Sequence, residues 1–521
     1  MNNSLAVPQV GRAARATTGG PTAGDLPSAR PSLRALLGLG LLGVLAGAAV
    51  LVSDGDPTLF GVLALIPLAG MILYRPVFGV YLALGGALLL EQYSIEGMSD
   101  PWTKRIPLFV NIGGNEEYLN AWTHENLSWF TANLLEVLLV WTGLALLLHA
   151  RRRGGRLRTG TLGWPLLLFM GAVVFSWAFG LLGGGDWKVS LWEIRALFYM
   201  AICYLLAVNL IRTPGEVRIA GWIVIICIGV KAIQGIYRYL VPFGGDLTNI
   251  YAITGHEDAL FLDSLLLLAV LFAIYGGPLR QRLLTWGLAP FALFTLFATR
   301  RRAAIFALLI GGASLLMTLP PARRAMLPRL IVPLFLIGLI YVGAFYNSDA
   351  VIAKPIQMVK SLYQPTDDRD ASSNQYRNFE QYNVMRTIRH NPVVGVGFGR
   401  PYEMLVPLPP IAFPLRDYIP HNEVLWIWLK MGTAGFVVFW LFIAAAVVQG
   451  SLVLRRLKDP YFQALAAMIL ALVLMQVVIA YADLQLTFYR NMVYLGIMLG
   501  ILMRLDALDP LLAKLRPERT V

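Results

Sequence analysis

The feature that most constrains this chain is a succession of apolar runs, each long enough to cross about 30 Å of bilayer hydrocarbon as a helix. We count about 14 of them, at 35–52, 57–74, 76–92, 130–149, 163–184, 191–211, 217–237, 259–276, 284–299, 303–319, 328–346, 423–449, 461–482 and 489–505. Hydrophobic residues make up 57% of the 521 residues and charged residues only 14%. The sequence therefore predicts an all-α, polytopic membrane protein with about 12–14 transmembrane helices.

The basic residues behind the net charge of +13 lie mainly in short loops between the apolar runs, so they do not indicate a nucleic-acid-binding surface. If the arginine-bearing N-terminal tail lies in the cytoplasm, every second loop after it is basic, including 151–158, 212–218, 280–282, 323–329 and 455–458. This alternation satisfies the positive-inside rule. It predicts an even number of spans with both termini in the cytoplasm, and no nucleic-acid partner.

The runs also predict the domain organisation. Residues 1–34 are expected to form a disordered cytoplasmic tail and 506–521 a second cytoplasmic tail, flanking membrane helices within 35–346 and 423–505. Between the two membrane parts lies 347–422, the longest polar stretch, which we expect to be a functional extracytoplasmic loop. Within it, 376–389 has a helical pattern that Pro392 ends.

Three consecutive arginines, Arg300, Arg301 and Arg302, interrupt two apolar runs on the predicted outer side. Arginine near hydrocarbon needs a partner or water. Three interpretations are open: the side chains snorkel to lipid headgroups, the number of spans differs by one at this point, or the arginines bind an anion such as a phosphate. Arg195 and Arg238 are predicted at the same outer level, which favours a polar cavity opening outward.

A second polar feature precedes the apolar run that begins at 423. Gly395, Gly397 and Gly399 alternate in "NPVVGVGFG", which allows tight turns and close approach to a ligand or a helix. A proline-rich connector then leads to His421, and Asn422 is a candidate N-cap. His421 is either a structural hydrogen-bonding residue or a general base; no spaced set of metal ligands surrounds it.

These motifs resemble those of the bacterial O-antigen ligase and O-antigen polymerase family. "HNEVLWIWLKMGTAGF" is similar to the family's His-Asn motif, and "NPVVGVGFG" to its Gly-x-Gly-x-Gly segment. "TRRRAAIFALL" is similar to its arginine motif, with Arg302 as the favoured match, and "SSNQYRNFEQYNVM" supplies Arg377. The resemblance covers roughly residues 195–440.

The resemblance implies a C-type membrane glycosyltransferase in the bacterial inner membrane. Its expected donor is an undecaprenyl-diphosphate-linked saccharide on the outer leaflet, and its acceptor a saccharide or lipid-linked saccharide. Transfer would be inverting and independent of metals and cofactors. His421 would be the base and Arg302 a diphosphate ligand, with Arg195 or Arg238 as candidates for a second family arginine.

Other functions stay open at this point. "TGHEDALF" stands where the family has a glycine-rich stretch, so ligase and exopolysaccharide polymerase are both expected possibilities. Polysaccharide-export or chain-length proteins are candidate partners. The alternative to an enzyme is a transporter or flippase for lipid-linked oligosaccharide, which would place polar residues near the bilayer midplane; a structural scaffold of an export complex is a third.

Overall fold

The computed structural model describes residues 57–92, 108–111, 131–152, 154–245, 253–299, 301–318, 321–325, 327–348, 353, 356, 368–411 and 413–515. The chain divides into two units, Met1–Gly70 and Met71–Val521. Helix α2 (Pro57–Tyr74) crosses the boundary between the units, and all other described helices belong to the second.

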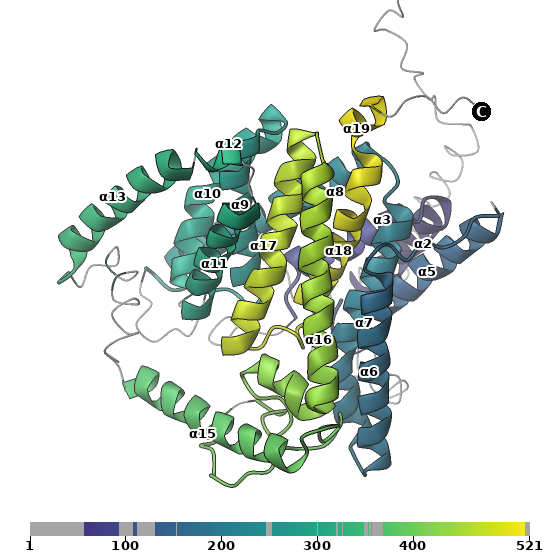
Figure 1. Ribbon diagram of the computed structural model, residues 1–521, viewed down its shortest axis with the longest axis vertical. Helices are drawn as coiled ribbons and strands as arrows, with labels where there is room; N and C mark the ends of the chain where they lie inside the picture. The colour runs from purple at the N-terminus through teal and green to yellow at the C-terminus, as the bar shows by residue number, and fades with distance from the viewer. Residues whose placement is uncertain are drawn as a thin grey trace, which may run out of the picture. The chain divides into compact units, whose positions relative to one another are not determined.

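The regular secondary structure of the described residues is all helix, with no β-strand and a single isolated bridge between Asn111 and Asn133. After α2 the helices are α3 (Val77–Leu89), α5 (Leu134–Arg152), α6 (Gly163–Leu182), α7 (Trp187–Leu210), α8 (Pro214–Leu240), α9 (Asp258–Tyr275), α10 (Leu279–Ala298), α11 (Arg302–Thr318), α12 (Pro321–Arg324), α13 (Leu327–Phe345), α15 (Asp368–His390), α16 (Glu423–Arg456), α17 (Pro460–Ala482), α18 (Tyr489–Leu508) and α19 (Pro510–Leu515). Figure 1 shows α16 and α17 side by side, with α15 beyond the ends of the bundled helices.

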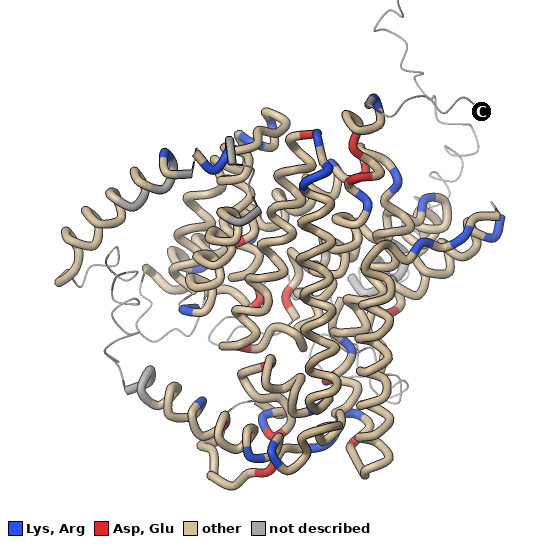
Figure 2. The backbone as a smooth tube through the Cα atoms, viewed as in Figure 1, with Lys and Arg blue, Asp and Glu red and all other residues tan. Residues whose placement is uncertain are grey.

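The helices agree with the predicted apolar runs. Every predicted run from 57–74 onward coincides with a helix, whereas 35–52 lies outside the described residues. Seven described helices are long and apolar enough to cross a membrane, namely α5, α6, α7, α8, α9, α16 and α17. Basic residues lie mainly toward the helix ends (Figure 2). The prediction of an all-α polytopic membrane protein is confirmed.

Small residues allow the central helices to pack closely. A Cβ added at Gly496 of α18 would lie 2.3 Å from the backbone oxygen of Met200 on α7. One added at Gly500 would lie 2.6 Å from the Cβ of Ala207. Glycine at both positions lets the two backbones approach, as in other membrane helix pairs.

Buried charges pair with one another between α8, α9, α18 and the residues that follow α3. Lys231 Nζ lies 2.8 Å from Glu91 Oε1 and 3.7 Å from Asp258 Oδ2. Arg238 Nη2 lies 2.6 Å from the same Glu91 oxygen. Arg490 Nη2 lies 2.6 Å from Asp258 Oδ1. Charges in a membrane interior need such partners, so this network joins four helices through matched charges.

The backbone of α16 breaks at Gly432, whose φ of +62° interrupts the helix. The segment before α16 fills the break. Val396 N donates to Leu429 O at 2.9 Å, and Gly397 N donates to Lys430 O at 3.0 Å. Helix carbonyls that lose their own partners are thereby satisfied. The segment 392–397 is thus fixed against the helix that begins at the histidine.

All three alternating glycines are required by sterics, since Gly395 has a φ of +73° and a Cβ there would lie 2.5 Å from the backbone oxygen of Leu429. Gly397 has a φ of +83°, and a Cβ there would lie 2.3 Å from the Cα of Gly180 on α6. Gly399 also has a φ of +83°, and its Cβ would meet the backbone oxygen of Asp186 at 2.6 Å. The glycine segment therefore serves close contact between backbones, and it holds the N-terminal parts of α7 and α16 together.

Candidate functional site

His421 is paired with a buried carboxylate from α15. Its Nδ1 lies 3.0 Å and 3.1 Å from the two carboxylate oxygens of Glu380, and its backbone N–H donates to Glu380 Oε2 at 2.9 Å. The Glu380 side chain is 3% exposed and that of His421 is 25% exposed. A carboxylate accepting from Nδ1–H leaves the lone pair on Nε2, and it stabilises the imidazolium that forms when Nε2 takes a proton.

The start of α16 holds this histidine in place. Asn422 caps the helix, because its Oδ1 accepts from Leu425 N at 3.1 Å. Glu423, which is fully buried, accepts hydrogen bonds from the backbone N–H groups of residues 485–487 and from Thr487 Oγ1 at 2.5 Å. These hydrogen bonds connect the turn between α17 and α18 to Glu423, which lies two residues after His421.

A small cavity of about 190 Å³ opens beside His421. Its wall is formed by α15, the start of α16 and the end of α17, and it is lined by Arg377, Glu380, Gln381, Val384, Pro420, His421, Asn422, Leu425, Tyr481 and Ala482. Tyr376 packs edge-on against the imidazole, with ring centroids 5.5 Å apart. Burial, and then the charge of Glu380, raise the pKa of Tyr376 to about 12, so its hydroxyl stays neutral near pH 7.

A second histidine–carboxylate cluster adjoins this cavity. Asp483 Oδ2 accepts from His256 Nδ1 at 3.2 Å and from Arg301 Nη1 at 3.2 Å. Arg301 Nη2 also contacts His256 Nε2. Burial acts to raise the pKa of Asp483, but the hydrogen bond from His256 and the positive charges of Arg301 and Arg377 outweigh it and hold this pKa well below its usual range. Ala482, which lines the cavity, directly precedes Asp483, so the cluster and the cavity wall are neighbours.

The predicted arginines separate into two groups. Arg301 and Arg377 lie as described, and Arg302 begins α11 with Nη2 3.4 Å from Asn374 Oδ1 on α15. Arg302 thus contacts the helix that carries Arg377 and Glu380. Arg300 lies outside the described residues.

The remaining two predicted arginines are not brought to His421. Arg195 donates to Asn111 Oδ1 and to Thr131 O, both at 2.8 Å, and lies 3.4 Å from Glu136. Arg238 is 1% exposed and belongs to the buried charge network with Glu91. Neither lines the cavity beside His421. Both side chains are used to join elements of the bundle.

A buried ion pair links the glycine segment to α7 and α16. Glu193 Oε1 lies 2.7 Å from Lys430 Nζ, and both side chains are fully buried. Glu193 Oε2 accepts from Gly399 N at 2.5 Å, and Lys430 Nζ donates to Arg400 O at 2.5 Å. The pair neutralises two charges inside the bundle and fixes the connector that leads to His421.

Sequence reasoning missed Glu380 and the pairing of Asp483. Glu380 lies three residues after Arg377 on one helix, so the two share a face of α15. That spacing is the signal that could have found it. The Asp483 cluster joins residues 182 and 227 positions apart, and no local pattern predicts such contacts.

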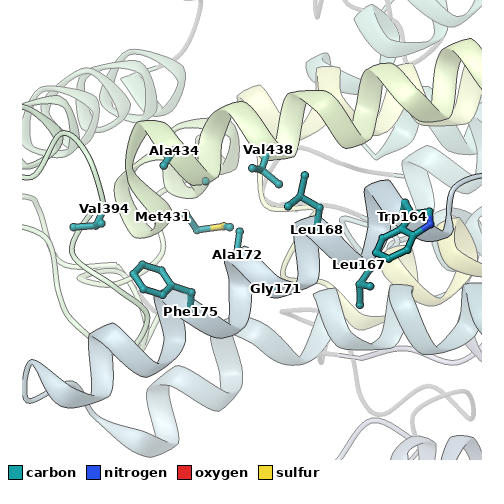
Figure 3. A pocket seen from close by; sticks show the side chains of 11 residues that line it. Trp164, Leu167, Leu168, Gly171, Ala172, Phe175, Val394, Met431, Ala434 and Val438 are labelled. Carbon is teal, nitrogen blue, oxygen red and sulfur yellow. The ribbon is translucent and has the colours of Figure 1, made fainter.

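A larger hollow of about 500 Å³ lies between α6 and α16 and has a different character. Figure 3 shows Leu168, Ala172 and Phe175 of α6 facing Met431 and Val438 of α16. Its lining is apolar, so it lacks the acid–base groups found at His421. Within the described residues, no group of three or more His, Cys, Asp or Glu side chains is arranged to hold a metal ion.

The arrangement at His421 suits proton transfer beside an anion. An imidazole oriented by a buried carboxylate is a general base, and a guanidinium on the same cavity wall stabilises phosphate oxygens. No curated protein matches the chain. Residues 287–440 match the family described as O-antigen ligase, and this segment contains α11, α15, the glycine segment and His421. The chain is thus a multi-pass membrane protein whose residues 287–440 are similar to the O-antigen ligase family.

Proposed function

We propose that this protein transfers or polymerises undecaprenyl-diphosphate-linked oligosaccharide during synthesis of a surface or extracellular polysaccharide. The reaction would take place on the outer leaflet of the bacterial inner membrane, with both termini in the cytoplasm. One observation carries the proposal: His421, oriented by the buried Glu380, shares a cavity with Arg377. The family match supports glycosyl transfer in general, and the donor is inferred from the cationic wall.

The proposed chemical step is a direct displacement. His421 Nε2 takes the proton of an acceptor hydroxyl, whose oxygen attacks the anomeric carbon of the donor sugar. The bond from that carbon to the diphosphate oxygen breaks, and the electron pair leaves with the lipid diphosphate. One displacement at carbon inverts its configuration. Glu380 stabilises the imidazolium, which then returns its proton to water.

The leaving diphosphate would be held by Arg377 with Arg301 and Arg302. Arginine suits this role because it stays charged and binds phosphate oxygens bidentately. Asp483 and His256 contact Arg301 on two sides, so this guanidinium is oriented before the donor binds. Preorganised charge of this kind stabilises a transition state without reorganisation. The acceptor would be a saccharide or lipid-linked saccharide, and export or chain-length proteins would receive the product.

The test is a transfer assay with purified protein in lipid nanodiscs, undecaprenyl-diphosphate-linked glycan and an acceptor glycan. We expect wild type to release undecaprenyl diphosphate and lengthen the acceptor, and His421→Ala to do neither. His390→Ala is the matched control, because His390 on the same helix as Glu380 also pairs with a glutamate, at 2.9 Å from Glu403, but both side chains are exposed. Equal release by wild type and His421→Ala would refute the mechanism. Movement of intact donor across the bilayer without release would instead identify a flippase.

A further inference from the structure

A second polar hollow lies at the opposite membrane face from His421. It is lined by His149, Ala150, Gly155, Arg156, Leu157, Arg158, Asn209, Arg212 and Arg504, and has a volume of about 320 Å³. The helices α7 and α18 begin beside the residues that hold His421 and end at this hollow. We call it the basic pocket, after Arg156, Arg158, Arg212 and Arg504.

The basic pocket has a fixed framework. Asn209, at the end of α7, holds the loop that carries two of the arginines: its Oδ1 accepts from Arg158 N and its Nδ2 donates to Arg158 O, both at 2.8 Å. Arg212 Nε donates to Asn209 O at 2.7 Å. Arg504 Nε donates to Ile211 O at 3.4 Å. Backbone contacts therefore orient guanidinium groups from a loop, a helix end and α18 toward one hollow.

The charge of the basic pocket is not balanced within its lining. Four arginines line it and no carboxylate does. Of the acids close by, Asp506 lies 3.8 Å from Arg456, and Glu216 caps α8, accepts from the backbone N–H of Arg212 at 2.7 Å and lies 4.0 Å from Arg75. Arg158 and Arg212 repel Arg504 electrostatically, and Asp506 offsets this repulsion only in part. The positive-inside rule explains arginines in these loops, but it does not explain why four of them converge on a cavity.

We propose that the basic pocket binds the phosphate group of an anionic ligand at this membrane face. Guanidinium groups bind phosphate oxygens bidentately, and basic pockets between membrane helices bind anionic lipid headgroups. The phosphate could belong to an anionic phospholipid of the adjoining leaflet or to a soluble phosphate compound. A bound anion would relieve the repulsion among the arginines and join the ends of α5, α7 and α18. The proposal is independent of the transferase activity at His421.

The experiment compares full-length protein in nanodiscs of phosphatidylcholine alone with nanodiscs that also contain phosphatidylglycerol or cardiolipin. Native mass spectrometry counts retained anionic lipids, and thermal unfolding measures their stabilising effect. A parallel arm adds inorganic phosphate or diphosphate to the phosphatidylcholine sample. The test variant is Arg158→Gln with Arg504→Gln. The matched control is Arg151→Gln with Arg152→Gln, which removes the same charge from the end of α5 but does not alter the pocket lining.

We expect anionic lipid to be retained and to raise the unfolding temperature of wild type and of the control variant. In the test variant, affinity should fall roughly tenfold or more. The same pattern with phosphate or diphosphate alone would support the pocket and assign it a soluble ligand. Equal binding by the test and control variants would overturn the proposal, as would no binding in any arm. Unfolding in phosphatidylcholine without added anion checks that the test variant is folded.

Discussion

The two histidine–carboxylate pairs near the cavity at His421 differ in whether a ring nitrogen is left without a hydrogen-bond partner. His256 is engaged on both nitrogens, with Asp483 on Nδ1 and Arg301 on Nε2. His421 is engaged on Nδ1 by Glu380, and within the described residues no hydrogen bond occupies its Nε2. His256 is the more exposed side chain, at 42% against 25% for His421, yet both of its ring nitrogens have a partner.

Either histidine could in principle accept a proton or position a neighbouring charge, and the difference in hydrogen bonding indicates which ring suits which role. A ring with a lone pair facing a cavity can take a proton. A ring held between a carboxylate and a guanidinium orients its neighbours instead. We therefore propose that His421 transfers the proton and that His256 positions Arg301, and substitutions at each residue should have different kinetic consequences.

Replacing His421 should cause the largest loss. In His421→Gln the amide cannot act as a base near pH 7, so the turnover rate should fall roughly 10²- to 10⁴-fold. His421→Ala should be equally impaired. The measurement is the single-turnover release of undecaprenyl diphosphate from prebound donor. A His421→Gln protein within threefold of wild type would assign the base elsewhere, whereas His390→Ala should match wild type.

Removing the carboxylate behind His421 should have the next largest effect. Glu380→Gln keeps the side-chain size but removes the charge that stabilises the imidazolium, so we expect a loss of roughly 10- to 100-fold in turnover rate. Donor affinity should change little. The rate should be measured alongside that of Glu403→Gln, which alters the exposed pair on His390. Equal rates for these two variants would show that the buried pair has no special role.

His256 should respond differently to a conservative replacement. His256→Ala removes the contact to Arg301, and we expect donor binding to weaken about tenfold, as for the loss of a hydrogen bond to a charged group. Gln can both donate to Asp483 and accept from Arg301, so His256→Gln should recover most of that affinity. Titration of donor gives KM and kcat for both variants. A loss confined to kcat, without recovery in His256→Gln, would give His256 a catalytic role.

The smallest expected effect concerns the dependence of stability on pH. The pKa of Asp483 is depressed in the folded protein, so its contribution is fully present above the unfolded value of about 3.9. It should decline as pH falls below that value and be lost below the folded pKa. The difference in unfolding temperature between wild type and Asp483→Asn should therefore be constant from pH 7 to pH 5 and shrink below pH 4. If the difference in unfolding temperature vanished already at pH 6, the claim that Asp483 is ionised in the folded protein would be wrong.

The sequence was most informative about helices. Apolar runs predicted each described membrane helix, because hydropathy and length are local properties. The helical pattern at 376–389 also predicted most of α15, which extends from Asp368 to His390. Likewise, Asn422 was identifiable as a cap from its position before an apolar run, and its side chain does accept from Leu425 N.

The partners of the charged residues could not be predicted from the sequence. Arg238 and Arg302 share a predicted membrane level, yet Arg238 is buried against Glu91 and Arg302 meets Asn374 on α15. Hydropathy places a residue along the membrane normal but does not say which helix it faces. The Glu380–His421 pair depends on α15 folding back over the start of α16, a contact that only tertiary packing creates.

The most direct measurement is carbethoxylation of the five histidines by diethyl pyrocarbonate, followed by mass spectrometry and the transfer assay. The reagent needs an unprotonated ring nitrogen with an available lone pair. We predict that loss of activity follows modification of His421, that bound donor glycolipid prevents both, and that His256 reacts more slowly despite its greater exposure. Full activity after complete modification of His421, or complete loss of activity while His421 is unmodified, would contradict its role as the base.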